Sequence, residues 1–274
     1  MQRAEAPIGV FDSGVGGLTV MREIIRQIPK ERVVYFGDTA RVPYGSKSRD
    51  TILKYSRQII RFLKTKEVKT IVVACNTASA VALEEIREEL DIPIIGVIKP
   101  GAKTAIKATR NGKIGIIGTE TTVRSKIYSH FIQDLNPNLT VIGKACPLFV
   151  PLVEEGEFLK SPIAAEIATH YLEDLKKEGI DTLILGCTHY PLMRKLIGQI
   201  MGEQVVLVNP AYETARGLKE LLKQEGLENQ KEIAESENPY AFYVSDTADK
   251  FQQFAENILT CSAENTMKIN IEDY

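Results

Sequence analysis

Short apolar runs alternate with longer amphipathic stretches along the chain. Nine apolar runs are candidate β-strands, and they lie at 8–11, 33–36, 70–74, 94–98, 114–117, 139–142, 182–185, 205–208 and 241–244. Apolar residues recur at helical spacing between them, which predicts helices over 18–28, 50–66, 78–90, 123–135, 161–179, 191–202 and 214–226. Apolar strands separated by helices are typical of parallel sheets that are covered on both faces. The pattern therefore predicts an α/β fold with doubly wound, mostly parallel sheets.

The apolar runs also pair up at nearly constant offsets. The run at 8–14 resembles 114–119 at an offset of 106 residues, and 70–77 resembles 182–189 at an offset of 112. Further matches are Val33 with Val141 and Pro43 with Pro151, both at offset 108, and Pro100 with Pro210 at offset 110. Ordered matches with little drift indicate an internal duplication. We therefore expect two similar domains related by a pseudo-two-fold axis.

The duplication also predicts where the domains begin and end. The first domain should be discontinuous and contain 1–98 plus 211–274, and the second should contain 99–210. The chain would then cross twice, with hinges near 97–101 and 208–214. We expect the active site in the cleft between the two domains.

Each half places one cysteine directly after a buried strand, Cys75 in the first and Cys187 in the second. Open α/β sheets bind ligands at this end of their strands. If the halves face each other, the two thiols approach one ligand from opposite sides. Racemisation needs this arrangement, because one group removes a proton from a tetrahedral carbon while the other delivers a proton from behind. The alternative is that both cysteines are small core residues, but polar residues, 76–77 and 188–189, follow each of them.

Composition argues against several other classes of protein. The chain has 34 Lys and Arg against 36 Asp and Glu, a net charge of -2, and the charges are scattered, which argues against a nucleic-acid partner. No apolar run approaches the roughly 20 residues of a membrane span, and the first residues do not form a signal peptide. The four cysteines form no CxxC pair, so we expect reduced thiols. We expect a cytoplasmic protein that binds a small molecule and neither a membrane nor nucleic acid.

The sequence also lacks the usual signals of a bound cofactor. The glycine run GVGG after Asp12 and Ser13 is not GxGxxG, has no P-loop lysine, and follows an acidic residue that would repel phosphate. No lysine context marks a pyridoxal phosphate Schiff base. We expect no cofactor and no metal. A carbanion would then be stabilised by hydrogen-bond donors to the carboxylate and by exclusion of water from a closed pocket.

Five motifs in this order and spacing resemble those of the glutamate racemases, in the aspartate/glutamate racemase superfamily. They are DSGVGGLTV, GDTARVPYG, ACNTAS, CPLFVPLVEEG and GCTHYPL, and the resemblance runs from Pro7 to about Leu259. It implies a cofactor-independent isomerase that interconverts L- and D-glutamate and supplies D-glutamate for bacterial peptidoglycan. It also implies a possible homodimer. Because only six residues precede Pro7, we do not expect the dependence on a peptidoglycan precursor that accompanies an N-terminal extension in some members.

The resemblance also implies roles for the two cysteines and their neighbours. Cys75 resembles the thiol that takes the α-proton from D-glutamate, and Cys187 the thiol that takes it from L-glutamate. His189 would assist Cys187, because an imidazolium stabilises a thiolate and a neutral imidazole accepts its proton. Glu154 aligns best with the family's auxiliary glutamate, although spacing alone does not separate it from Glu155.

Asp12 resembles the auxiliary group of Cys75. Its negative charge would raise the pKa of a nearby thiol, so Asp12 would have to act as a proton acceptor or by orienting the site. The alternative is that Asp12 caps the helix that starts near Gly17.

Substrate contacts are expected from backbone donors and hydroxyls more than from arginines. The resemblance implies contacts from Asp12, Ser13, Pro43, Tyr44, Gly45, Asn76, Thr77, Thr119, Thr122, Thr188 and His189. The alternatives are that Tyr44 is a packing residue and that the threonines cap helices. We interpret Asp38 and Cys146 as structural, and we assign no role to His130, His170, Cys261 or the residues after Thr260.

Other functions remain open at this point. A sister enzyme would act on aspartate, a hydantoin or another small acid, and pocket size would decide between them. A thiol redox enzyme or a Cys/His metal site would show a Cys75–Cys187 disulfide or retained metal. A non-catalytic binding protein would have no need of both cysteines.

Overall fold

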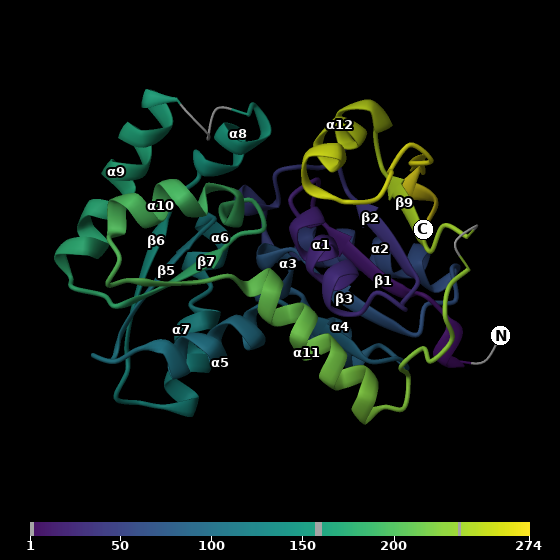
Figure 1. Ribbon diagram of the computed structural model, residues 1–274, viewed down its shortest axis with the longest axis horizontal. Helices are drawn as coiled ribbons and strands as arrows, with labels where there is room; N and C mark the ends of the chain where they lie inside the picture. Colours follow the sequence, from purple (N-terminus) through teal and green to yellow (C-terminus); the bar gives the residue numbers. More distant parts are fainter. Residues whose placement is uncertain (1–2, 157–160, 235–236) are drawn as a thin grey trace.

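The computed structural model describes residues 3–156, 161–234 and 237–274, and these contain two parallel sheets (Figure 1). The first sheet has the order β10-β9-β2-β1-β3-β4. Its strands are β10 (Met267–Lys268), β9 (Tyr240–Val244), β2 (Val33–Gly37), β1 (Ile8–Asp12), β3 (Thr70–Val73) and β4 (Ile94–Gly96). The second sheet has the order β6-β5-β7-β8, with β6 (Thr140–Ala145), β5 (Lys113–Gly118), β7 (Thr182–Gly186) and β8 (Val206–Val208). The predicted α/β class is confirmed, and every strand pair described is parallel.

The two sheets share one strand order over four positions. In the first sheet β1 pairs with β2 and β3, and β3 pairs with β4. In the second sheet β5 pairs with β6 and β7, and β7 pairs with β8. This repeated order is what an internal duplication predicts. The strands at 240–268 join the first sheet, while the exact domain boundaries, 1–98 plus 211–274 and 99–210, remain a prediction.

Helices connect the strands and cover both sheets (Figure 1). The α-helices are α1 (Leu18–Gln27), α2 (Arg49–Lys64), α3 (Asn76–Val81), α4 (Leu83–Glu88), α5 (Ile98–Ala108), α6 (Glu120–Arg124), α7 (Ile127–Leu135), α8 (Phe149–Glu154), α9 (Pro162–Lys177), α10 (Arg194–Met201), α11 (Pro210–Gln224) and α12 (Ala248–Ile258). Short 3-10 turns are η1 (Arg3–Glu5), η2 (Tyr44–Ser46), η3 (Tyr190–Met193) and η4 (Ile271–Asp273). None of the helices described is long and apolar enough to span a membrane.

Some predicted boundaries are wrong. The helix predicted over 78–90 is broken between α3 and α4, and the one over 123–135 is broken between α6 and α7, where Lys126 has a left-handed φ of 53°. The strand predicted over 94–98 ends at Gly96, because Ile98 already begins α5. The two segments predicted as hinges, 97–101 and 208–214, are mainly helical. α5 begins at Ile98, and α11 begins at Pro210 after its N-cap Asn209.

The two sheets share a buried core through α5 and α11. One cluster of buried apolar side chains contains Ile8 from β1 and Ile116 from β5, together with Ala102 of α5 and Ala215 of α11. Figure 1 shows α11 running between the two sheets. The helices approach closely, since a Cβ on Gly101 would lie 3.2 Å from the Pro210 side chain. This shared core places the carboxyl ends of the two sets of strands around one site.

Candidate active site

The carboxyl ends of the central strands of both sheets meet around one cavity. Asp12 ends β1, Cys75 follows β3, and Cys187 follows β7. The cavity has a volume of about 420 Å³. It is lined by Ser13, Val42, Pro43, Tyr44, Gly45, Ser46, Cys75, Asn76, Thr77, Thr119, Glu120, Pro147, Val150, Pro151, Glu154, Cys187, Thr188 and His189. Of the residues predicted from the sequence, Asp12 and Thr122 are missing from this lining, and the others are brought together.

Cys75 lies at the N-terminus of α3 and is almost completely buried. Its Sγ accepts a hydrogen bond from the Ala78 amide at 3.4 Å and donates to Ser13 Oγ at 3.5 Å. Burial and the negative charge of Asp12 raise the pKa of the Cys75 thiol to about 12, against smaller opposing effects of the Ser13 and Ala78 hydrogen bonds. With so high a pKa, Cys75 carries its proton at neutral pH in the ligand-free protein.

Asp12, at the end of β1, is fully buried, and its charge acts on Cys75. Its Oδ2 accepts a hydrogen bond from the Gly14 amide at 3.0 Å. Burial raises the pKa of Asp12, an effect opposed by the positive charge of His189 and by backbone amides, including that of Gly14. The first helix begins at Leu18 without a side-chain cap, so Asp12 does not act as its N-cap. A raised pKa makes Asp12 a better proton acceptor than an ordinary carboxylate.

Cys187, His189 and Glu154 form a chain of polar contacts on the other side of the site. Cys187 Sγ lies 3.8 Å from His189 Nδ1, and His189 Nε2 lies 3.0 Å from Glu154 Oε1. Burial alone would lower the pKa of His189, but its hydrogen bonds with Cys187 and Glu154 and their negative charges raise it to about 10. An imidazolium in this position stabilises a neighbouring thiolate.

The same geometry distinguishes Glu154 from Glu155. Glu154 ends α8, lines the cavity and contacts His189. Glu155 lines a neighbouring cavity of about 370 Å³, to which Glu154 also contributes, but it does not line the cavity of the two cysteines. The contact with His189 therefore favours Glu154 as the auxiliary residue.

Three threonine hydroxyls from the two halves form a cluster beside the cavity. Thr77 Oγ1 lies 3.0 Å from Thr119 Oγ1 and 3.4 Å from Thr122 Oγ1, and Thr119 and Thr122 are 3.0 Å apart. Thr119 also caps α6 by accepting a hydrogen bond from the Thr122 amide at 3.3 Å. Thr122 is buried behind the other two. Capping and ligand binding are thus compatible roles for Thr119, whereas Thr122 supports the cluster from outside the lining.

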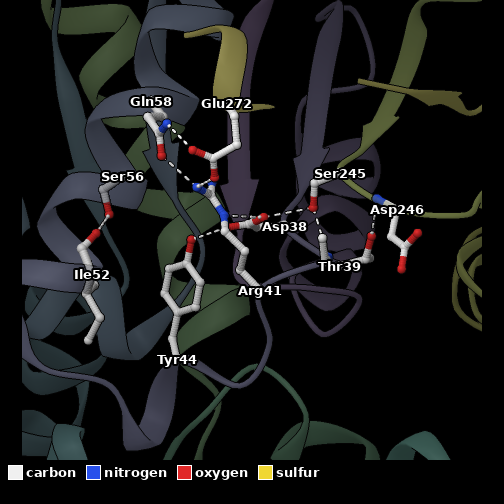
Figure 2. A network of polar contacts seen from close by, with 11 residues as sticks. Asp38, Thr39, Arg41, Tyr44, Ile52, Ser56, Gln58, Ser245, Asp246 and Glu272 are labelled. Carbon is white, nitrogen blue, oxygen red and sulfur yellow. Dashed lines mark hydrogen bonds and ion pairs between the residues drawn. The ribbon is translucent and has the colours of Figure 1, made fainter. Parts of the chain in front are cut away.

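Two other predicted contacts have side chains that are already engaged. The Tyr44 hydroxyl donates to Asp38, as Figure 2 shows, and the Tyr44 residue is only 1% exposed. The Tyr128 hydroxyl donates to Asn76 Oδ1 at 2.8 Å. Tyr44 therefore has a packing role through its side chain, and its hydroxyl is not free to donate to a ligand. Asp38 is structural, as predicted, because it is fully buried and holds several partners.

Two further residues of the first half support the His189 side of the site, and sequence reasoning missed them. A Cβ on Gly16 would lie 2.5 Å from His189 Nδ1 and 2.4 Å from Thr188 Oγ1. Thr19 Oγ1 donates to the Thr188 backbone oxygen at 2.9 Å. A larger residue at position 16 would clash with the side chains of Thr188 and His189 unless they moved. The GVGG run could have suggested that another segment packs closely against this backbone, but that segment, 188–189, is distant in sequence.

The lining determines which ligands suit the cavity. It contains no lysine or arginine among the described residues, and its charged side chains are Glu120, Glu154 and, when protonated, His189. Hydroxyl groups and backbone amides are therefore the donors available to a ligand carboxylate. All four cysteines are free. The described residues contain no group of three His, Cys, Asp or Glu side chains placed to hold a metal ion.

Comparisons with known proteins identify close relatives. The family model for Asp/Glu/Hydantoin racemase matches residues 8–216. The chain is 48% identical over 265 residues to a glutamate racemase of Geobacter metallireducens, covering 97% of both chains. It is similar to the crystal structure of a glutamate racemase isoform from Bacillus anthracis, with a TM-score of 0.91, 40% identity and coverage of 97% of this chain and 98% of that one. A Francisella tularensis glutamate racemase in complex with D-glutamate also matches with a TM-score of 0.91, at 38% identity over 99% of this chain and 100% of that one.

Proposed function

We propose that this chain, which belongs to the Asp/Glu/Hydantoin racemase family and is an amino-acid racemase, interconverts L- and D-glutamate through two opposed cysteines. The observation that carries the mechanism is the cavity into which each half of the duplicated fold contributes one cysteine. The names of the relatives support glutamate as the substrate, and one related structure contains D-glutamate. Supply of D-glutamate for peptidoglycan and a cytoplasmic location belong to the same proposal.

In the L-to-D direction, the Cys187 thiolate removes the α-proton while the Cys75 thiol delivers a proton to the opposite face. The Cα–H bond on one face and the S–H bond of Cys75 break, while a Cα–H bond on the other face and an S–H bond on Cys187 form. The number of protons on the two cysteines is therefore unchanged. The His189 imidazolium, held by Glu154 at 3.0 Å, stabilises the thiolate before the transfer. The raised pKa keeps Cys75 protonated in the ligand-free protein, and this is the state that the L-to-D direction requires.

In the D-to-L direction, Cys75 must first lose its proton. The rise in its pKa to about 12 corresponds to a free energy of about 4 kcal/mol relative to an ordinary thiol. Asp12 is suited to accept that proton, because its charge acts on Cys75 and burial has raised its own pKa. The ammonium group of a bound amino acid adds a positive charge near Cys75, which also favours its thiolate.

The α-proton of an amino acid is far less acidic than a thiol, so the developing carbanion needs stabilisation. The hydroxyls of Thr77, Thr119 and Thr188 and backbone amides at the starts of α3 and α6 would donate to the ligand carboxylates. Closure of the two halves about the segments near 97–101 and 208–214 would exclude water during the transfer. A homodimer is part of the proposal and can be tested by light scattering.

The test is circular dichroism of L- and of D-glutamate with metal-free and pyridoxal-phosphate-free protein in deuterated water. We expect loss of the optical signal from both enantiomers, with deuterium entering Cα. Cys75→Ala and Cys187→Ala should each reduce the rate by at least about a thousandfold. Cys146→Ala is the matched control, because Cys146 is buried in the second half but does not line the cavity.

Each outcome has a distinct meaning. If glutamate is inert and aspartate or a hydantoin inverts, the two-cysteine mechanism stands and the substrate is wrong. If glutamate inverts without deuterium at Cα, or if either cysteine variant stays active, the two-base mechanism is wrong.

A further inference from the structure

The 38–46 loop brings Pro43, Tyr44 and Gly45 to the cavity, although it contains only the short turn η2. The buried Asp38 carboxylate organises this loop, as Figure 2 shows. Its Oδ2 accepts a hydrogen bond from Arg41 Nε at 2.8 Å and another from the Tyr44 hydroxyl, and its Oδ1 accepts from Ser245 Oγ at 2.8 Å. The positions of Arg41 and Tyr44 are thus coupled through one carboxylate.

Arg41 extends this coupling away from the cavity. Its guanidinium carbon Cζ lies over the Tyr55 ring, 3.9 Å from the ring centroid, and Nη1 donates to Gln58 Oε1 at 2.6 Å. The same Nη1 donates to Glu272 Oε1 at 3.2 Å, and Gln58 Nε2 donates to Glu272 Oε2 at 3.1 Å. Glu272 therefore contacts both the 38–46 loop, through Arg41, and α2, through Gln58 (Figure 2).

The 267–274 segment, which carries Glu272, is held in place by other contacts. β10 pairs with β9, and Ile271 is buried in the core beneath α2. The Tyr274 ring packs edge-on against Phe62 at a centroid distance of 5.3 Å. The segment therefore has its own anchors, so removing the Glu272 carboxylate need not detach it.

We propose that the 267–274 segment is part of the apparatus that positions the substrate-binding 38–46 loop, with Glu272 as a positioning residue that acts through Arg41. The carboxylates of Asp38 and Glu272 hold the guanidinium from two sides. The Arg41 side chain is 10% exposed, whereas that of Glu272 is 58% exposed. The Arg41–Glu272 contact is therefore partly exposed and supports the buried Arg41–Asp38 contact. Its loss should make the 38–46 loop more mobile without unfolding the protein.

The first test measures hydrogen–deuterium exchange of the ligand-free protein, which does not depend on the proposed function. The reporters are the amides of Ala40, which donates to Ser245 Oγ, and of Arg41, which donates to the Asp38 backbone oxygen. In Glu272→Ala these amides should exchange about two- to fivefold faster. Asp273→Ala is the matched control, since Asp273 lies on the same turn and accepts a side-chain hydrogen bond from Asn270.

The second test is kinetic and rests on the proposed function. Glu272→Ala should raise KM for glutamate about two- to fivefold and leave kcat within about twofold, because the loop binds substrate equally before and during the transfer. Glu272→Gln, which keeps an acceptor for Arg41, should fall between Glu272→Ala and the unaltered protein. Asp273→Ala should change neither constant.

Three results would overturn the proposal. The first is unchanged exchange at Ala40 and Arg41 in Glu272→Ala. The second is an equal effect of Asp273→Ala, which would indicate a general loss of charge on the turn. The third is a fall in kcat together with a lower melting temperature, which would assign Glu272 a structural role alone. If the unaltered protein fails to racemise glutamate, the proposed function is wrong, and the exchange comparison still decides whether Glu272 positions the loop.

Discussion

The charge of Asp12 suppresses the reactivity of Cys75, so Asp12→Asn should make this thiol more reactive while making the enzyme slower. A thiol with a pKa of about 12 is ionised in about one molecule in ten thousand at pH 8. The substitution removes the Asp12 charge and leaves burial, which is the larger cause of the raised pKa. A neighbouring charge commonly changes a thiolate fraction by about tenfold or more. A less basic thiolate is also a weaker nucleophile, so each tenfold gain speeds alkylation only about threefold.

The assay is alkylation of the ligand-free protein by iodoacetamide at pH 8, followed by digestion with trypsin. The peptide spanning 70–87 contains Cys75 as its single cysteine. Labelling of this peptide should become about three- to tenfold faster in Asp12→Asn. Racemisation by the same variant should fall about a hundredfold, because asparagine cannot accept the Cys75 proton.

Cys146 provides an internal control in the same sample. It is fully buried and lies outside the lining of the cavity, so faster labelling of both Cys75 and Cys146 would indicate unfolding. Unchanged labelling of Cys75 would refute the electrostatic reasoning, because it would mean that Asp12 already carries a proton at pH 8. Undiminished racemisation would refute the role of Asp12 as the proton acceptor.

Two further predictions concern the His189 side of the site. Glu154→Gln should lower kcat/KM about tenfold and lower the pKa of His189 from about 10, because it removes one of the interactions that raise this pKa. The His189 imidazolium should then lose its proton at a lower pH, which proton NMR measures. Glu155→Gln, the control, should change neither kcat/KM nor the pKa of His189. Gly16→Ala should lower kcat/KM about tenfold or more, because its Cβ would lie 2.5 Å from His189 Nδ1. Gly198→Ala is the control, since its Cβ would lie 3.6 Å from the Leu207 side chain, an ordinary contact distance; equal activity of the two glycine variants would contradict the packing account.

The strands could be predicted because the signal for each is local. The run at 183–185 is apolar throughout, and β7, which contains it, is buried on both faces. The duplication was visible because both halves kept their strand-end residues, including Cys75 and Cys187. The repeat predicts that the two sheets share one strand order, and they do so over four strands.

The elements that sequence reasoning missed have mixed or short signals. α5 contains Pro100 and Gly101, residues that usually end helices. Pro100 lies in the first turn, where its missing amide hydrogen would have no partner. Gly101 faces Pro210 at close range, a tertiary contact that local propensity does not report. β10 is only two residues long and depends on its pairing with β9.

The residues of the candidate site were easier to predict than their contacts. Motif resemblance pointed to Glu154 and Tyr44, but only the fold shows that Glu154 contacts His189 and that the Tyr44 hydroxyl is bound to Asp38. The partners of Asp38 include Ser245, more than two hundred positions away in the sequence. Such contacts follow from how β2 and β9 pair, which no local pattern specifies.

The different surroundings of the two thiols bear on how a racemase of this kind completes its cycle. L- and D-glutamate have equal free energies, so kcat/KM must be the same in both directions whatever the pKa of either cysteine. The asymmetry instead determines which protonation state the free enzyme holds. In the proposed mechanism, an L-to-D turnover leaves the proton on Cys187 and a thiolate on the buried Cys75, whose pKa the charge of Asp12 raises. A Cys75 thiolate costs about 4 kcal/mol more than that of an ordinary thiol, which favours return of a proton to Cys75. In the proposed mechanism, Asp12 on the Cys75 side and the His189–Glu154 pair on the Cys187 side are the groups that move protons on and off the two thiols between turnovers.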